Sequence, residues 1–127
     1  MKERWLWPGS VVMRVIDGDS FVAMVHRDMG FHGQASFLVK MRLERINAAK
    51  STSERGANAK ETLVRLVMGA VPSMPDSVHI ETTGPYKYGD EWMAEVTLAD
   101  GRNVSDEMVA SGHAVYWTGR GPRPADD

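Results

Sequence analysis

The residues best suited to chemistry are Asp17-Gly18-Asp19, where two carboxylates flank a glycine at the junction of two apolar runs. This pattern predicts a strand, a tight Asp-Gly turn and a second strand. A hairpin turn of this kind holds Asp19 at the mouth of a sheet, where its carboxylate can face a metal ion or a metal-bound phosphate. Most Asp-Gly turns are only turns, so these residues alone also fit a purely structural hairpin.

Two further stretches carry charged and aromatic side chains, namely 39–50 and Tyr86-Lys87-Tyr88-Gly89-Asp90. In this order and at these separations, the three stretches resemble the staphylococcal nuclease (thermonuclease) family, particularly its small phage-encoded members. The resemblance extends from about Val11 to about Tyr116 and includes a helix after the second stretch and a closing Asn-Val-x-x-x-x-Val-x-x-Gly-x-Ala segment. It implies an OB-type barrel with a nucleotide-binding groove.

The resemblance also implies a set of metal ligands. The family binds Ca²⁺ through the second aspartate of the turn, an acidic residue after the third strand and the next backbone carbonyl, which correspond here to Asp19, Asn47 and Ala48. Ca²⁺ takes six to eight oxygen ligands, and its affinity follows their charge. Because Asn47 is a neutral amide where an aspartate is common, we expect a weak or absent Ca²⁺ site, and no other cofactor.

Three more residues match positions that contact the nucleic acid in the family. Arg42 corresponds to the arginine that grips the scissile phosphate, and its planar fork suits two phosphate oxygens. Lys87 and Tyr88 correspond to residues that contact the terminal phosphate and stack on the nucleotide, a combination that favours single strands. Without the resemblance, Arg42 fits an exposed strand residue paired with Glu44, and the other two fit a solvated loop.

Two positions depart from the family's catalytic pattern. Lys50 replaces the glutamate taken as the general base, and Asp90 replaces a second arginine that stabilises charge on the phosphate. Loss of a general base costs ~10²–10⁴ in rate, and loss of a charge-stabilising donor costs on the order of 10²–10³. Glu54, one helical turn beyond Lys50, is either a substitute base or only part of a helix cap. Lys50 and Asp90 either pair across the groove or changed independently.

These observations favour a binding module that has lost efficient phosphodiester hydrolysis and that recognises single-stranded nucleic acid, a nucleotide or a protein. The alternative is a weak Ca²⁺-dependent nuclease that uses Asp19, Arg42 and Asn47. A third possibility is a phage protein that binds a host protein through Trp5, Trp7 and the loop around Phe31.

Composition limits these functions further. The sequence has 127 residues, no cysteine, and 15 Lys and Arg against 17 Asp and Glu, for a formal charge of −2. Disulfides and thiolate catalysis are therefore excluded, and any contact with nucleic acid must come from a local patch. The four histidines lack the spacing of a zinc site. Because the apolar run near the N-terminus is too short for a signal peptide or a membrane span, we expect a cytoplasmic protein, in the host cytoplasm if phage-encoded.

The predicted elements form one domain over 1–118, followed by a disordered tail over 119–127. Apolar patterning predicts strands over 10–16, 21–26, 35–46, 77–83 and 91–98. A helix is expected over 51–68 with a Ser51 to Glu54 capping box. A short helix capped by Asn103 or Ser105 should end near Gly112, with a short strand within 113–117. Together with the resemblance, this order predicts an α+β fold: a five-stranded OB-type Greek-key β-barrel with one helix between strands 3 and 4 and a short helix after strand 5.

Overall fold

The computed structural model describes residues 4–28, 30, 33–68, 78–85 and 91–117. Its centre is a closed five-stranded barrel with the strand order β1-β2-β3-β6-β5. Neighbouring strands are antiparallel except β3 and β6, which pair in parallel. This arrangement confirms the predicted α+β fold with an OB-type barrel. The barrel strands are β1 (Trp5–Asp17), β2 (Ser20–Asp28), β3 (Gln34–Leu43), β5 (Val78–Pro85) and β6 (Trp92–Thr97).

Alternating side chains fill the interior of the barrel. Phe21, Ala23 and Val25 of β2 are fully buried, whereas the residues between them are only partly buried. This is the period of two that a strand with one buried face requires. β5 shows the same alternation, since its buried residues are Val78, Ile80 and Thr82.

The third strand ends earlier than predicted. β3 stops at Leu43, a turn follows at Glu44 and Arg45, and Ile46–Asn47 forms a separate strand, β4, which pairs with β7 (Val115–Tyr116). Arg45 has a φ of 69°, a left-handed conformation that is uncommon for a residue other than glycine. The expectation of one strand over 35–46 was therefore wrong, because alternation of residue types does not reveal a turn at an arginine. The short strand expected near the end is confirmed by β7.

Helix α1 (Glu54–Met68) lies between the third and fourth barrel strands, as predicted. The predicted cap at Ser51 was wrong: the Ser53 hydroxyl accepts a hydrogen bond from the backbone N–H of Gly56 at 3.0 Å, the geometry of an N-cap. The backbone N–H of Ser51 instead donates to Asp17 Oδ1 at 2.8 Å. α1 turns one face to the barrel, with buried residues at Gly56, Ala59, Leu63 and Val67.

Helix α2 (Val104–Ala110) follows β6, as predicted. Of the two caps expected, Asn103 is the one used, since its side chain accepts from the backbone N–H of Asp106 at 3.0 Å. Gly112 follows the helix with a φ of 81°, a conformation that glycine adopts without strain. The predicted limits of this helix are thus confirmed to within one or two residues.

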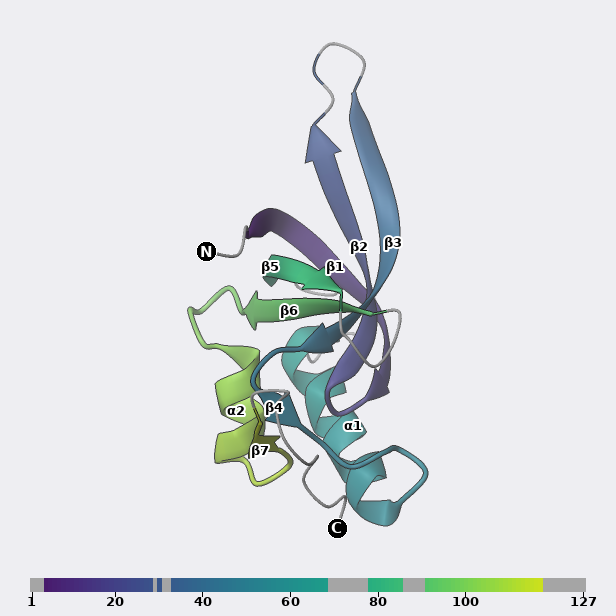
Figure 1. Cartoon of the computed structure of the whole chain (residues 1–127), viewed down its shortest axis with the longest axis vertical. Helices are drawn as coiled ribbons and strands as arrows, with labels where there is room; N and C mark the ends of the chain where they lie inside the picture. The colour runs from purple at the N-terminus through teal and green to yellow at the C-terminus, as the bar shows by residue number, and fades with distance from the viewer. Residues whose placement is uncertain (1–3, 29, 31–32, 69–77, 86–90, 118–127) are drawn as a thin grey trace.

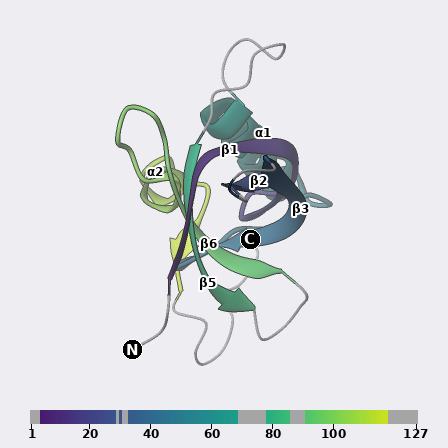
Figure 2. The same ribbon diagram turned by 90° about the horizontal axis from the view of Figure 1, so that it is seen from above.

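Beyond the other strands, β2 and β3 continue together as a two-stranded arm, while α1 and α2 lie toward the opposite end of the barrel (Figure 1). In the arm, 25–28 pairs with 34–37. Figure 2 shows β5 alongside β1, the strand pair that closes the barrel. Among the described residues, no helix is long and apolar enough to cross a membrane. The predicted disordered tail over 119–127 and the predicted loop residue Phe31 lie outside the described residues.

Candidate functional site

The Asp-Gly turn closes the β1–β2 hairpin as predicted, with Asp17 paired to Ser20. Gly18 is not among the glycines with a positive φ, so the turn does not need its conformational freedom. A glycine is needed here because there is no room for a side chain. A Cβ at residue 18 would lie 2.6 Å from the Cβ of Ala59 in α1 and 3.1 Å from that of Ala48. The turn is therefore packed directly against α1 and the segment 47–50.

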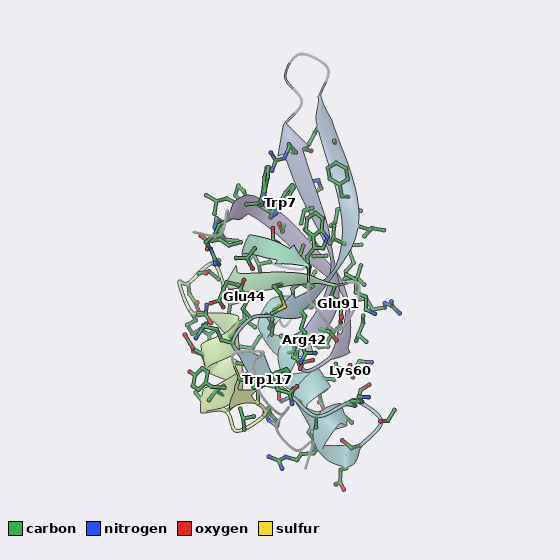
Figure 3. The ribbon with its side chains drawn as sticks, in the orientation of Figure 1. Trp7, Arg42, Glu44, Lys60, Glu91 and Trp117 are labelled. Atoms are coloured by element: carbon green, nitrogen blue, oxygen red, sulfur yellow. The ribbon has the colours of Figure 1, made fainter. Side chains whose placement is uncertain are left out.

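Three of the predicted site residues meet beneath this turn. Arg42 Nη2 lies 3.0 Å from Asp19 Oδ2 and 2.9 Å from Asn47 Oδ1. The backbone N–H of Ala48 donates to the same Asp19 oxygen at 2.9 Å. Asp19, Arg42 and Asn47 are only 1%, 5% and 2% exposed. The structure thus brings these three residues into one buried network. Figure 3 shows Arg42 beside α1.

The segment after β4 is held from both sides. Asp17 accepts from the backbone N–H of Ser51 at 2.8 Å and contacts the Ser20 hydroxyl at 3.4 Å. On the other side, a Cβ at Gly56 would lie 1.7 Å from the carbonyl oxygen of Lys50, so α1 touches the backbone of this segment. The main chain around Ala48 therefore has little freedom to move relative to Asp19.

Arg42 competes with a metal ion for the oxygens of Asp19 and Asn47. Asp19 Oδ2 and Asn47 Oδ1 both face the Arg42 guanidinium, which would repel a dication placed between them. Ca²⁺ requires six or more oxygen ligands, several of them charged. Within the part of the chain that the structure describes, no group of three or more His, Cys, Asp or Glu side chains is arranged to hold a metal ion.

The positions at which the sequence departs from the nuclease pattern are only partly described by the structure. Lys50 is exposed, and Glu54 is exposed as the first residue of α1. Glu54 lies in the first turn of α1. The positive end of the helix dipole stabilises its negative charge there. Lys87, Tyr88 and Asp90 lie outside the described residues.

A second cluster lies where the barrel opens toward the hairpin arm. A pocket of about 340 Å³ is lined by Trp5, Trp7, Val25, Arg27, Phe37, Val39 and Trp92. Sequence analysis identified the two N-terminal tryptophans and missed Arg27, Phe37 and Trp92. The signal available was the i, i+2 spacing of Trp5 and Trp7, which places both on one face of a strand. The other residues reach them only through the strand pairing.

A third cluster surrounds the turn at Arg45. The Arg45 guanidinium contacts Glu95 at 2.6 Å and Asp106 at 3.0 Å, and the Tyr116 hydroxyl donates to Asp106 at 2.9 Å. The hydrogen bonds to Glu95 and Asp106 raise the pKa of Arg45, and those from Arg45 and Tyr116 lower the pKa of Asp106. The hydrogen bond to Asp106 raises the pKa of Tyr116. This exposed network holds the β3–β4 turn against α2.

A search of protein-family models finds none that matches this chain, and no curated protein matches it. The resemblance to the staphylococcal nuclease family therefore depends on the motifs around Asp19, Arg42, Asn47 and Tyr88.

Proposed function

We propose that this chain is a staphylococcal-nuclease-like domain that binds single-stranded nucleic acid or a nucleotide and has lost efficient phosphodiester hydrolysis. One observation carries the loss of hydrolysis: Arg42 Nη2 lies within 3.0 Å of Asp19 and 2.9 Å of Asn47. The groups that would hold a metal ion and grip a phosphate are therefore bound to one another.

The chemistry of hydrolysis supports the same proposal. Cleavage needs a base for the attacking water and positive charge where negative charge develops on the phosphate. At the position of the base stands Lys50, whose ammonium has no lone pair to accept a proton. Arg42 is 5% exposed, and its charge is balanced by Asp19, so a phosphate would have to displace an existing ion pair to reach it.

The binding part of the proposal is supported by aromatic side chains at the surface of an OB-type barrel. Trp5 and Trp92 are 45% and 39% exposed, which is unusual for residues that bury large apolar areas. Exposed rings near cationic groups hold single strands through base stacking and phosphate contacts. A closed barrel supplies a rigid support for both.

A nuclease assay tests the loss of hydrolysis. A labelled single-stranded DNA is incubated with the wild-type chain in millimolar Ca²⁺, beside an Asp19→Asn variant that keeps an acceptor for the Ala48 N–H. We expect no cleavage above background by either protein, and calorimetry should show Ca²⁺ binding weaker than the micromolar range of sensor sites. Efficient Ca²⁺-dependent cleavage that Asp19→Asn abolishes would establish the nuclease alternative instead.

Binding is tested separately by fluorescence anisotropy with labelled single-stranded DNA and RNA of about ten nucleotides. We expect saturable binding that weakens with added salt, as phosphate contacts require. A wild-type chain that is folded by circular dichroism and binds none of these probes would refute the proposed function.

A further inference from the structure

The pocket at the open end of the barrel combines a rigid floor with exposed aromatic walls. Trp7 forms the floor: it is 6% exposed, its indole N–H donates to Thr82 Oγ1 at 3.0 Å, and its ring centroid lies 6.4 Å from that of Trp92. In Figure 3, Trp7 lies near the base of the hairpin arm, away from Arg42. The pocket is thus a second site, distinct from the buried network under the Asp-Gly turn.

The walls of this pocket present flat apolar surface to solvent. Trp5, Phe37 and Trp92 are 45%, 48% and 39% exposed although each could bury a large apolar area. The pocket volume of about 340 Å³ lies at the lower end of the range for small-molecule sites. This volume suits one planar ring system with a short substituent, rather than an extended chain of several residues.

Arg27 gives the pocket its charge. Its guanidinium carbon lies 4.5 Å from the centroid of Trp7 and 5.2 Å from that of Trp5, so the planar cation lies over both indoles. A guanidinium stacked in this way keeps its N–H groups directed outward in its own plane. In the described ranges, no carboxylate forms an ion pair with Arg27, and Arg27 is the one charged residue lining the pocket. The pocket is therefore complementary to a ligand with an anionic group.

We infer that this pocket binds one nucleotide of a single strand, with the base between the exposed rings and a phosphate on Arg27. The inference rests on the proposed function and assigns its binding site. A flat ring next to an anion matches the aromatic walls and the one cation, whereas an apolar peptide would leave Arg27 without a partner. Arg27 already occupies the cation–π position over Trp5 and Trp7, so the pocket disfavours a cationic ligand.

The strand register separates this pocket from Arg42. Trp92 pairs with Met41, and the residue next along β3 is Arg42. Successive side chains of a strand point to opposite faces, so Arg42 does not line the pocket.

Matched substitutions on the same strands test this assignment. Trp5→Ala and Phe37→Ala remove pocket rings, whereas Leu6→Ala and Leu38→Ala remove side chains that are 55% and 63% exposed at the adjacent positions. The adjacent positions project to the opposite face of each strand. Because base stacking contributes ~1–3 kcal/mol per base, each pocket variant should weaken binding of the ten-nucleotide DNA by about 5- to 150-fold. Each control variant should bind as the wild type does.

Arg27→Gln tests the phosphate contact. Loss of one contact to a single strand should reduce the slope of log affinity against log salt by about 0.7. An acidic peptide that contains tryptophan is titrated in parallel as the alternative ligand.

If the wild type binds DNA and all three pocket variants retain that binding, the assignment is overturned while the proposed function stands. Pocket-dependent binding of the peptide without binding of DNA would overturn both in favour of a protein partner. Circular dichroism of each variant separates these results from unfolding.

Discussion

At the scale of single residues, Arg42 is the centre of a buried network with Asp19 and Asn47. Its guanidinium binds the Oδ2 atom of Asp19 and the Oδ1 atom of Asn47. A buried ion pair adds little net stability compared with apolar residues, but removing one partner leaves the other charge buried. The network therefore fixes the position of the Asp-Gly turn over Ala48.

The first prediction concerns this ion pair. Arg42→Met should lower the free energy of unfolding by ~3–5 kcal/mol, because Asp19 then stays buried without the cation 3.0 Å away. The double variant Asp19→Asn/Arg42→Met should lose less than Arg42→Met alone, since it buries no charge. Urea denaturation followed by circular dichroism measures both. A loss below about 1 kcal/mol for Arg42→Met would be inconsistent with a structural ion pair.

The second prediction concerns pH and the exposed network around Arg45. In the folded state, Asp106 accepts hydrogen bonds from Arg45 and Tyr116, and these bonds lower the pKa of Asp106. The stabilisation is therefore present above the pKa of an unfolded aspartate, about 3.9, and is lost as pH falls through the lower folded value. The side chain of Asp106 is 51% exposed, so the effect should be small.

Asp106→Asn provides the measurement for this pH effect. Its urea midpoint should lie below that of the wild type at pH 6, and the two midpoints should converge as the pH falls below about 4. A difference between the proteins that is constant from pH 6 to pH 2 would show that the charge of Asp106 contributes nothing.

At the scale of elements, the site depends on the close approach of a turn and a helix. Gly18 lies so near Ala59 that a Cβ at residue 18 would be 2.6 Å from the Cβ of Ala59. Two small residues thus allow the β1–β2 turn to lie directly on α1. This contact places Asp19 close to the segment that contains Asn47 and Ala48, whose backbone N–H donates to Asp19.

The third prediction follows from this contact. Gly18→Ala should destabilise the fold by ~1–3 kcal/mol, the usual range for overpacking. Ala59→Gly in the same chain should restore part of that loss, even though glycine alone costs ~1 kcal/mol within a helix. Thermal denaturation of the two single variants and the double variant measures the coupling. Strictly additive losses would mean that the two residues do not meet.

The elements themselves were largely predictable because apolar alternation and helix caps are local signals. The errors arose where distant residues decide the structure. Ser53, not Ser51, caps α1, and the backbone N–H of Ser51 donates to Asp17, which lies 34 residues earlier. The turn at Arg45 depends on Glu95 and Asp106, which no local pattern connects to it. The aromatic pocket was missed for the same reason, since Trp92 reaches Trp7 only through the closed barrel.

At the scale of the whole molecule, the barrel separates two kinds of chemistry. The charged network of Asp19 and Arg42 is buried, and the aromatic pocket includes Arg27 and Phe37 of the hairpin arm. Only the second presents exposed groups to a ligand. The proposed binding site is therefore the aromatic pocket and not the network of Asp19 and Arg42.

The pairing of β1 with β5 also has consequences for the order of folding. This pairing joins residues such as Trp7 and Ile80, whereas the β1–β2 and β2–β3 hairpins join residues close in the sequence. Closing a long loop costs more chain entropy than forming a hairpin. We therefore expect the three N-terminal strands to form early and the β1–β5 pairing to form after the rate-limiting step.

The hydrogen bond from the Trp7 indole to Thr82, across 75 residues, reports on that late step. Thr82→Val removes its acceptor with little change of shape, so it should speed unfolding and leave the folding rate nearly unchanged. Val25→Ala, within the early hairpin, should instead slow folding. Stopped-flow tryptophan fluorescence separates the two rates, and slower folding of Thr82→Val would mean that barrel closure belongs to the nucleus. A late closure leaves the floor of the aromatic pocket as one of the last parts of the molecule to form.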